Sequence, residues 1–282
     1  MVTSAPRSGP LSVRSISATE HLSFIRSRGS VSFLQTPAWA TVKNEWRGES
    51  IGWFDGETVR GAALVLYRQL PRLRRYLAYL PEGPDIDWAD DDLADWLTPL
   101  AAHLKSQGAF GIRMGPPVVV RRWNATTIKA AIADPVLTSL SDVPADVSDD
   151  AALALQESLT RLGWKELATE AGFSAGQPKF NFQIPLAGRS EDDVLAGMNQ
   201  LWRRNIKKAV KLGVEVTVGR RDDLADFHRI YAETAERDHF APRPLLYFER
   251  MWDALTAEEA DRLVLYLAHH EGALVAATTM VR

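Results

Sequence analysis

The chain has 282 residues, of which 46% are hydrophobic, with nine tryptophans and no cysteine. This length and composition predict a packed globular protein of one large or two medium domains, and the missing cysteine excludes disulfides, thiolate metal sites and a cysteine nucleophile. The formal net charge of −3 excludes a generally basic nucleic-acid binder, so attraction to a polyanion has to come from particular segments.

The sequence carries no signal for membrane insertion. No apolar run approaches the roughly 20 residues that a membrane-spanning helix needs, and the start of the chain lacks the apolar centre of a signal peptide. Together with the absence of cysteine, this favours a cytoplasmic protein whose contact with a membrane would be peripheral. Residues 1–16 are rich in Ser and Pro, and we expect them to form a flexible tail.

Helix signals dominate the next part of the chain. Ser17 suits the start of a first helix, residues 31–34 suit a short strand, and Thr36 followed by Pro37 opens a second helix. The side chains expected on the second helix are Trp39, Val42 and Trp46 along one apolar side, with Lys43 beside it.

A group of strands follows. The dipeptide Asp55-Gly56 separates two strand-like runs, residues 50–54 and 58–67, which is a strong hairpin signal. A third strand at residues 75–80 leads into a Gly- and Pro-containing loop at residues 81–87. We then expect a helix at 89–105 and a strand at 111–114. This interleaving of helices and strands indicates a mixed α/β (α+β) fold.

The second half repeats the first in outline, as a strand, two helices and a β-hairpin. We place a domain boundary near residue 180, which gives domains at residues 17–180 and 181–282. Because the chain ends at Arg282 just as a strand is completed, we expect the second domain to be incomplete, with its edge covered by a missing segment or by another subunit. The elements expected are a helix at 151–162, a strand at 180–186, helices at 224–236 and 246–255, and strands at 263–268 and 274–281.

The clearest helix signal covers residues 190–213 and coincides with the densest basic cluster. Ser190 suits the N-cap, three carboxylates follow it in the first turn, and Gly213 suits a left-handed stop. At about 100° per residue, the helix has one apolar stripe that we expect to be buried and one cationic stripe opposite. The apolar stripe is Leu195, Met198, Trp202, Ile206 and Ala209, and the cationic stripe is Arg203, Arg204, Lys207, Lys208 and Lys211.

The cationic stripe has two interpretations. It can be a solvated face that complements the negative end of the helix dipole. It can also be an anion site, because arginine guanidinium groups match phosphate oxygens in bidentate geometry and cations on one arc attract a polyanion. The helix by itself leaves both interpretations open.

Three short patterns resemble functional motifs, and a structural explanation is favoured for each. Residues 172–176 have the spacing of a nucleophile elbow, but a helix-like run precedes them and Gln-Pro follows, so we expect a turn. His269 and His270 are adjacent at a predicted hairpin and point to opposite sides, which disfavours a metal site. Asp85 and Asp87 occupy a loop where Asp favours turns, although a carboxylate held there could also bind an amine or a sugar hydroxyl.

Five stretches together resemble the Fem-type (FemABX) family of peptidoglycan interpeptide-bridge aminoacyltransferases. Their order and spacing cover nearly everything from residue 30 onward. The stretches are FLQTPAWATVK at 33–43, YLPEGPDID at 79–87, RRNIKKAVKLGV at 203–214, residues 234–240, and YFERMW at 247–252.

This resemblance implies two GNAT-like (acyl-CoA N-acyltransferase-like) domains that use aminoacyl-tRNA as co-substrate and need no cofactor or metal. It implies transfer of an amino acid to the stem peptide of a peptidoglycan precursor, a lipid-linked (lipid II) or UDP-linked muramyl-pentapeptide, with peripheral contact at the inner membrane surface. It carries roles over to matching positions. Lys43 and Arg204 would bind the phosphates, with Arg203, Lys207 and Lys208 in support, and Tyr79, Asp87 and Tyr247 would contact the sugar or peptide. No catalytic base can be named.

The sequence departs from the family at three places. The chain ends before the region that completes the second domain and contributes residues near the reacting ester, so we expect it to bind the acceptor but to lack catalysis. Glu82 stands where many relatives have a basic residue, which weakens the phosphate argument at that loop. No helical arm lies between Lys211 and Leu224, so we expect no arm-based contact with tRNA.

Two rival functions stay open. One is a GNAT-type N-acetyltransferase that uses acetyl-CoA; it would need a Gly-rich turn whose amides bind the pyrophosphate, and the sequence has no such turn in a suitable context. The other is a non-catalytic module that binds the precursor or another polyanion.

Overall fold

The computed structural model describes residues 9–167 and 177–282, and the chain divides into two compact units. The first unit consists of Met1–Pro37 and Glu45–Gln177, and the second consists of Ala38–Asn44 and Pro178–Arg282. Segment Ala38–Asn44 thus belongs to the second unit, whereas the sequence analysis assigns it to the first domain. We describe each unit by itself.

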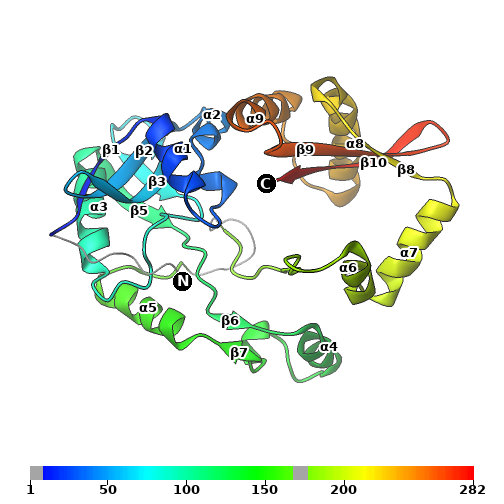
Figure 1. The fold of residues 1–282 in the computed structure, drawn as a ribbon, viewed down its shortest axis with the longest axis horizontal. Coiled ribbons are helices and arrows are strands. Elements are labelled where there is room, and N and C mark those ends of the chain that lie inside the picture. The colour runs from blue at the N-terminus through cyan, green and yellow to red at the C-terminus, as the bar shows by residue number, and fades with distance from the viewer. Residues whose placement is uncertain (1–8, 168–176) are drawn as a thin grey trace. The chain divides into compact units, whose positions relative to one another are not determined.

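The first unit is built on a five-stranded sheet with the order β1-β2-β3-β4-β5 (Figure 1). The pairs from β1 to β4 are antiparallel, and β4 and β5 are parallel because helix α3 crosses over between them. The Asp55-Gly56 hairpin between β2 and β3 is confirmed, with Gly56 at a φ of +59°. The elements are β1 Ser12–Ser15, β2 Arg47–Asp55, β3 Thr58–Gln69, β4 Tyr76–Leu80, α3 Ala94–Ser106 and β5 Ala109–Met114.

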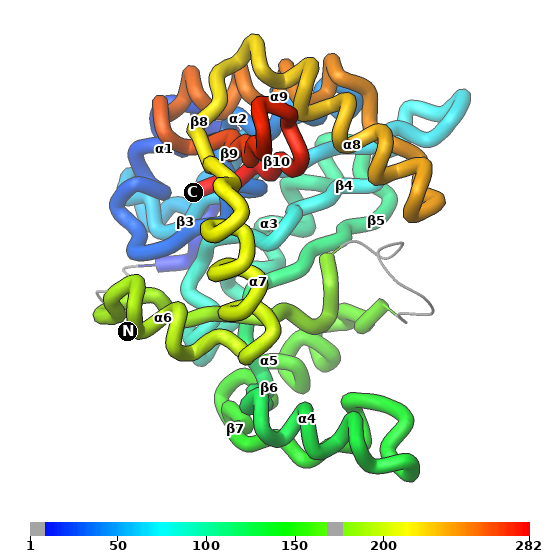
Figure 2. Tube along the Cα trace, turned by 90° about the vertical axis from the view of Figure 1, so that its right-hand side faces the viewer, coloured from blue at the N-terminus to red at the C-terminus, as the bar shows by residue number. Residues whose placement is uncertain are grey.

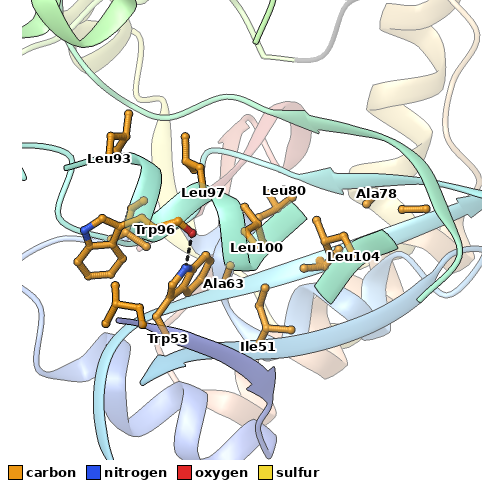
Figure 3. Close-up of a cluster of buried hydrophobic side chains, with 14 of the residues drawn as sticks. Ile51, Trp53, Ala63, Ala78, Leu80, Leu93, Trp96, Leu97, Leu100 and Leu104 are labelled. Atoms are coloured by element: carbon orange, nitrogen blue, oxygen red, sulfur yellow. Dashed lines mark hydrogen bonds between the residues drawn. The ribbon is translucent and has the colours of Figure 1, made fainter. Parts of the chain in front are cut away.

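The main hydrophobic core lies between α3 and one face of this sheet (Figure 3). Trp53 of β2 is fully buried, and its indole nitrogen donates a 2.8 Å hydrogen bond to the backbone carbonyl of Trp96 in α3. This bond satisfies the one polar atom of a large buried ring. Other members are Ile51, Ala63, Ala78, Leu80, Leu93, Leu97, Leu100 and Leu104.

Helix α1 (Ala18–Arg26) contacts strands β2 and β3. It begins as predicted at Ser17, which forms a capping box with Glu20. The next element is a correction: residues 31–34 were expected to form a strand, but Phe33–Gln35 form a short 3-10 helix, η1. Helix α2 (Pro37–Val42) follows; it begins at the predicted proline but ends at Val42, before Trp46.

Three further expectations are corrected. Ser12–Ser15 lie in the predicted tail, but they form β1, because their backbone pairs with β2. Residues 180–186 have the alternation of a strand, but the structure assigns no strand to them, and Phe182, Ile184 and Leu186 are exposed. The predicted helix over 190–213 is two helices, α6 (Glu191–Gly197) and α7 (Gln200–Lys211).

The end of the first unit contains short elements and one longer helix, α5. Helix α5 starts next to its predicted position, with the side chain of Asp149 as N-cap, and Gly163 follows its end at a φ of +85°. The elements are β6 Arg121–Arg122, α4 Ala125–Ala133, η2 Leu140–Asp142, β7 Val147–Ser148 and α5 Asp150–Arg161.

The second unit contains a three-stranded antiparallel sheet, β10-β9-β8, with two helices against it (Figures 1 and 2). Phe227, Tyr231 and Phe248 pack between these helices, with ring centroids 5.0 to 6.1 Å apart. The predicted helices and hairpin are confirmed, and β8 is an additional strand. The elements are β8 Glu215–Val218, η4 Arg221–Asp223, α8 Leu224–Asp238, α9 Leu245–Glu258, β9 Leu263–His270 and β10 Ala273–Val281.

The same order of elements occurs twice along the chain. Strand β1 is followed by α1, by α2, most of which belongs to the second unit, and by the antiparallel pair β2–β3; strand β8 is followed by α8, α9 and the antiparallel pair β9–β10. In both, the opening strand pairs antiparallel with the first strand of the hairpin. The repeated outline read from the sequence is therefore present in the strand pairing. None of the helices within residues 9–167 and 177–282 is long and apolar enough to cross a membrane.

The buried His21 of α1 should make stability depend on pH. Its Nδ1 lies 2.8 Å from the Ser50 hydroxyl, and burial lowers the pKa of His21 to about 4. An unfolded His has a pKa of about 6.5, so the unfolded chain binds more protons between these values. The free energy of unfolding should then fall by about 3 kcal/mol as the pH drops from about 6.5 to 4.

Urea unfolding across this pH range measures the effect. In a His21→Gln variant this part of the pH dependence should disappear, while a His270→Gln variant in the β9–β10 hairpin should keep it. An unchanged pH slope in His21→Gln would show that another group is responsible.

Candidate functional site

Segment Ala38–Asn44 is fixed at both ends to helix α9. The Ala38 amide donates a 3.0 Å hydrogen bond to the Glu258 carboxylate, and Arg250 donates a 2.7 Å hydrogen bond to the Asn44 side chain. A carboxylate at the N-terminus of α2 is also favoured by the helix dipole. These contacts hold the lysine between the two ends, Lys43, over one face of α9.

At that face two of the predicted site residues meet. The Lys43 ammonium lies 5.6 Å from the centroid of the Tyr247 ring and 5.8 Å from that of Trp39. The Arg243 guanidinium lies 4.6 Å from the Tyr247 centroid. These are cation–π distances, and they place two positive charges around one aromatic ring. We call Trp39, Lys43, Arg243 and Tyr247 the Tyr247 cluster.

The loop before α9 positions Arg243. Helix α8 ends at His239, which adopts a left-handed conformation with a φ of +58° and turns the chain. His228 Nε2 donates a 2.9 Å hydrogen bond to the Arg243 carbonyl, and the Tyr231 hydroxyl accepts one from the Arg243 amide at 3.4 Å. Because the backbone of Arg243 is held at both its polar groups, its side chain has a fixed origin beside Tyr247.

A second candidate site lies in the first unit, around Tyr79 of β4. The Tyr79 and Trp46 rings are 6.1 Å apart, the Arg68 guanidinium is 5.7 Å from the Trp46 centroid, and Gln177 donates a 2.9 Å hydrogen bond to the Tyr79 hydroxyl. Burial raises the pKa of Tyr79, which keeps its hydroxyl neutral. We call Trp46, Arg68, Tyr79 and Gln177 the Tyr79 platform. Aromatic faces with polar groups at their edge suit a sugar or a peptide.

The loop that follows Tyr79 is held by hydrogen bonds from the side chain of Gln35, which is buried at 1% exposure. Its side-chain NH2 donates a 2.6 Å hydrogen bond to the Pro81 carbonyl, and its side-chain oxygen accepts one of 3.0 Å from the Leu64 amide. Gly83 leaves room for this side chain, because a Cβ on Gly83 would lie 2.4 Å from Gln35 Cδ. The loop is therefore held against β3 in one position.

The two aspartates of this loop have different environments. The Asp87 side chain accepts a 3.1 Å hydrogen bond from the Ala89 amide, which is the turn-forming role expected of Asp. Asp85 is ion-paired with Arg28 at 3.2 Å, and its backbone exchanges two hydrogen bonds with Ala62. Burial raises the pKa of Asp85 although the guanidinium of Arg28 opposes this. A ligand that replaced Arg28 would therefore meet a carboxyl that is more easily protonated than usual.

Within the predicted basic helix, Arg203 has a structural role. The chain breaks between α6 and α7, where the Asn199 side chain caps α7 by accepting a 2.9 Å hydrogen bond from the Trp202 amide. Arg203 links the two helices by donating hydrogen bonds to the backbone carbonyls of Ala196 and Met198, at 2.8 and 2.6 Å. Its guanidinium is thus engaged with the end of α6, which the predicted phosphate role did not anticipate.

The remaining cations of α7 project from its exposed surface. The predicted burial of the apolar stripe is wrong, because no residue of α7 is buried and Trp202 is 61% exposed. Helix α7 leads into β8 and points away from α8 and α9 (Figures 1 and 2). In the described part of the chain, Arg204 therefore does not join the Tyr247 cluster, and its predicted role stands separately from that of Lys43. The cations concerned are Arg204, Lys207, Lys208 and Lys211.

The other motifs supply no further site. The elbow-like residues 172–176 lie outside the described residues. His269 and His270 end β9 and pair with Leu274 and Ala273. Within residues 9–167 and 177–282, no group of three or more His, Cys, Asp or Glu side chains is placed to hold a metal ion.

Sequence reasoning missed several residues at these sites. Gln35 lies inside the stretch 33–43, Trp46 lies just after it, and Arg243 lies in the loop before α9; none of the three had been assigned a role at the site. No local sequence signal identifies the role of Gln35, because its burial and its contact with the Gly-Pro loop arise from the fold. Arg68 comes at the end of a strand and carries no local signal.

Comparisons of this sequence with family models and with curated proteins indicate the same family. The model of the FemAB family matches residues 16–271. Lipid II:glycine glycyltransferase of Staphylococcus aureus is 27% identical over 261 residues, covering 89% of this chain and 53% of that protein, and the version from strain MRSA252 is 26% identical. The chain therefore spans about half the length of the curated relatives it matches.

The solved structure of FemX matches 91% of this chain and 57% of its own, with a TM-score of 0.65 and 24% identity. This likeness confirms the predicted mixed α/β fold class, which the chain shares with FemX. The match of the family model to most of the sequence shows that this chain belongs to the FemAB family.

Proposed function

We propose that the protein is an aminoacyltransferase that moves an amino acid from aminoacyl-tRNA to the stem peptide of a muramyl-pentapeptide precursor of peptidoglycan. The observation that carries this proposal is the family match over residues 16–271 together with relatives named lipid II:glycine glycyltransferases. The acceptor in this proposal is a lipid-linked or a nucleotide-linked precursor, since both carry the same muramyl-pentapeptide and pyrophosphate. The co-substrate in this proposal is a charged tRNA, with no cofactor.

Each of the two sites, taken by itself, offers groups that suit part of such a precursor. The Tyr247 cluster offers cations to a pyrophosphate and an aromatic ring to the adjoining sugar, because charge-assisted hydrogen bonds from Lys and Arg are the strong contacts to phosphate. The Tyr79 platform offers aromatic faces and a hydroxyl to sugar or peptide. Asp87 would act with Tyr79, and Arg204, supported by Lys207 and Lys208, would bind a further phosphate.

The reaction needs little more than positioned groups. The acceptor amine attacks the ester carbonyl of the aminoacyl-tRNA, loses its proton, and the tRNA hydroxyl leaves. Binding both substrates with the amine oriented toward the ester carbonyl supplies much of the rate enhancement. Hydrogen-bond donors to the developing oxyanion supply more. The half-buried carboxylates of the described residues include no group whose position identifies it as the base.

An acetyl-CoA-dependent reaction fits this chain less well. A CoA pyrophosphate requires free backbone amides at a helix start and no competing negative charge. The segment that leads from β4 into α3 is strongly acidic instead, and an acidic segment repels a polyphosphate. Its carboxylates are Glu82, Asp85, Asp87, Asp90, Asp91 and Asp92.

A mass-spectrometric transfer assay tests the proposal. The protein is incubated with UDP-muramyl-pentapeptide and a pool of charged tRNAs, and in parallel with acetyl-CoA. We expect the precursor to gain the mass of one amino-acid residue in the first reaction only. Acetylation of the precursor would favour the acetyltransferase, and absence of any product from a protein that binds the precursor would leave a precursor-binding module.

Arg204 allows a separate test of the α7 cations. Arg204→Ala should weaken binding of the UDP-linked precursor about fivefold and make the affinity less dependent on salt, because one screened charge contact is lost. Isothermal titration at two salt concentrations measures both effects, with Lys129→Ala on the exposed helix α4 as control. Unchanged affinity in Arg204→Ala would remove the phosphate role from this residue.

A further inference from the structure

The first unit contains a pocket that neither of the sites described above uses. Its volume is about 920 Å³, and its walls come from helix α3, strand β5 and the residues that follow α5, with Arg75 just before β4 (Figure 1). None of the residues that line it belongs to the Tyr247 cluster or to the Tyr79 platform. A pocket of this size can hold a small organic molecule.

Backbone contacts bring two cations to this pocket from distant parts of the sequence. Arg75 is positioned by the turn between β3 and β4, where its carbonyl accepts a 2.9 Å hydrogen bond from the Leu70 amide. Lys105 lies in the last turn of α3. The Tyr76 amide donates a 3.1 Å hydrogen bond to the carbonyl of Gly108, which turns the chain after α3 at a φ of +86°. Both cations therefore line the same pocket.

The pocket is positively charged. Arg75 and Lys105 are exposed, and in the part of the chain that the structure describes neither forms an ion pair with a carboxylate. None of the described residues that line the pocket is acidic, and the sequence has no Asp or Glu between Glu57 and Glu82. Lys105 also complements the negative end of α3, but Arg75 precedes a strand and has no such structural explanation. The pocket is therefore suited to an anion.

Two aromatic side chains line the same pocket. Phe110 of β5 is 54% exposed, which leaves a ring open to a ligand. Trp164 is partly buried, and its position is fixed because Gly163 turns the chain at a φ of +85° and the Trp164 amide donates a 3.0 Å hydrogen bond to the Leu159 carbonyl. Thr98 of α3 adds a hydroxyl that can donate or accept. Rings placed in this way can stack on a flat ring of a ligand.

This combination fits one class of ligand. A nucleoside phosphate carries a flat base that stacks on aromatic side chains and phosphate oxygens that accept charge-assisted hydrogen bonds from Arg and Lys. A fatty acid would satisfy the cations but would leave its chain partly in water, because the pocket is open to solvent at Phe110. A simple inorganic anion would leave both aromatic side chains unused.

We propose that this pocket binds a nucleoside phosphate, with the base against Phe110 and Trp164 and the phosphates at Arg75 and Lys105. A free nucleotide and an unpaired nucleotide of an RNA chain present the same groups, and the test below separates these two sources. The inference does not rest on the proposed function, because the pocket shares no residue with the two sites assigned to the precursor.

Isothermal titration of the full chain tests the proposal, with ADP, GDP, adenosine, pyrophosphate and a short oligoadenylate RNA as ligands. We expect ADP or GDP to bind at least about tenfold more tightly than adenosine, which lacks the phosphates, and than pyrophosphate, which lacks the base. Binding of the RNA with no binding of ADP or GDP would assign the pocket to a nucleotide within a chain. Pyrophosphate binding as tight as that of ADP and GDP, or binding of none of the ligands, would overturn the proposal.

Single variants locate the ligand. Arg75→Gln and Phe110→Ala should each weaken binding of the nucleotide or RNA about tenfold or more, because each removes one of the two kinds of contact. Lys129→Gln and Ile132→Ala on α4, where Ile132 is 81% exposed, are the matched controls and should bind as the parent does. Circular dichroism shows that each variant is folded. Unchanged binding in both pocket variants would place the ligand elsewhere and overturn the proposal.

Titration with the UDP-linked precursor separates this pocket from the sites assigned to the acceptor. Arg75→Gln and Phe110→Ala should bind the precursor as the parent does, and Lys43→Ala should bind the nucleotide or RNA as the parent does. Failure of the proposed function would then leave nucleotide binding intact, and the reverse. A loss of precursor affinity in Phe110→Ala would assign the pocket to recognition of the acceptor and contradict the proposal of a separate site.

Discussion

Replacement of Lys43 by alanine is expected to weaken binding of UDP-muramyl-pentapeptide by about 10- to 100-fold, because a charged hydrogen bond to phosphate contributes about 1.5 to 3 kcal/mol. Lys43 is the residue of the Tyr247 cluster that α2 and α9 position together, through contacts of Ala38 with Glu258 and of Asn44 with Arg250. Titration by tryptophan fluorescence measures the change, since Trp39 lies beside the ammonium.

Matched variants give this result its meaning. Lys129→Ala removes a lysine from the exposed helix α4 and should leave the affinity unchanged. Tyr247→Phe keeps the aromatic face and should retain most of the affinity, whereas Tyr247→Ala should lose it in the same way as Lys43→Ala. If Lys43→Ala bound the precursor as the parent does, the Tyr247 cluster would not be a phosphate site.

Gln35→Leu should lower the free energy of unfolding by about 4 kcal/mol, since the variant leaves buried backbone groups at Leu64 and Pro81 without partners at about 1 to 3 kcal/mol each. Urea unfolding measures the loss. The exposed Gln156→Leu on α5 is the control and should change stability little.

Gly83→Ala tests the same contact from the other side. The new Cβ would lie 2.4 Å from Gln35 Cδ, so the loop or the glutamine has to move. We expect a stability loss of the same sign and a weaker interaction of the Tyr79 platform with precursor. Stability equal to the parent in both Gln35→Leu and Gly83→Ala would show that the loop is not held in this way.

Most helices and strands of both units could be predicted from local signals in the sequence. The Asp-Gly turn, the proline at the start of α2 and the capping serine of α1 each act within a few residues, so they can be read directly. The fold class and the family follow from the same stretches. The strand expected at 31–34 failed because Ser32 caps a short 3-10 turn instead.

Long-range contacts explain the other errors. Ser12–Ser15 form a strand only because β2 lies beside them, whereas residues 180–186 have the alternation of a strand but are not part of one in the described structure. The break between α6 and α7 depends on Asn199 as a second N-cap inside a continuous amphipathic pattern. Periodicity alone does not detect such a cap, because the apolar residues keep helical spacing across it.

The candidate sites were predictable in part. Lys43 and Tyr247 were selected through the family resemblance, but their proximity depends on α9 holding a segment about 200 residues earlier in the chain (Ala38 with Glu258 is separated by 220). In the sequence, Arg203 could not be distinguished from the other cations. Its hydrogen bonds to Ala196 and Met198 form only because the helix breaks between α6 and α7. Gln35 lies in the stretch 33–43 that carries the family resemblance, but its role depends on its burial and on its hydrogen bonds with Leu64 and Pro81, which local sequence does not show.

The most direct test of the account is titration of this chain with UDP-muramyl-pentapeptide and, in parallel, with acetyl-CoA, followed by tryptophan fluorescence. Trp39 in the Tyr247 cluster and Trp46 in the Tyr79 platform both lie where the precursor is proposed to bind. We expect saturable binding of the muramyl ligand, lost in Lys43→Ala, and no response to acetyl-CoA. Saturable binding of acetyl-CoA with no response to the precursor would contradict it.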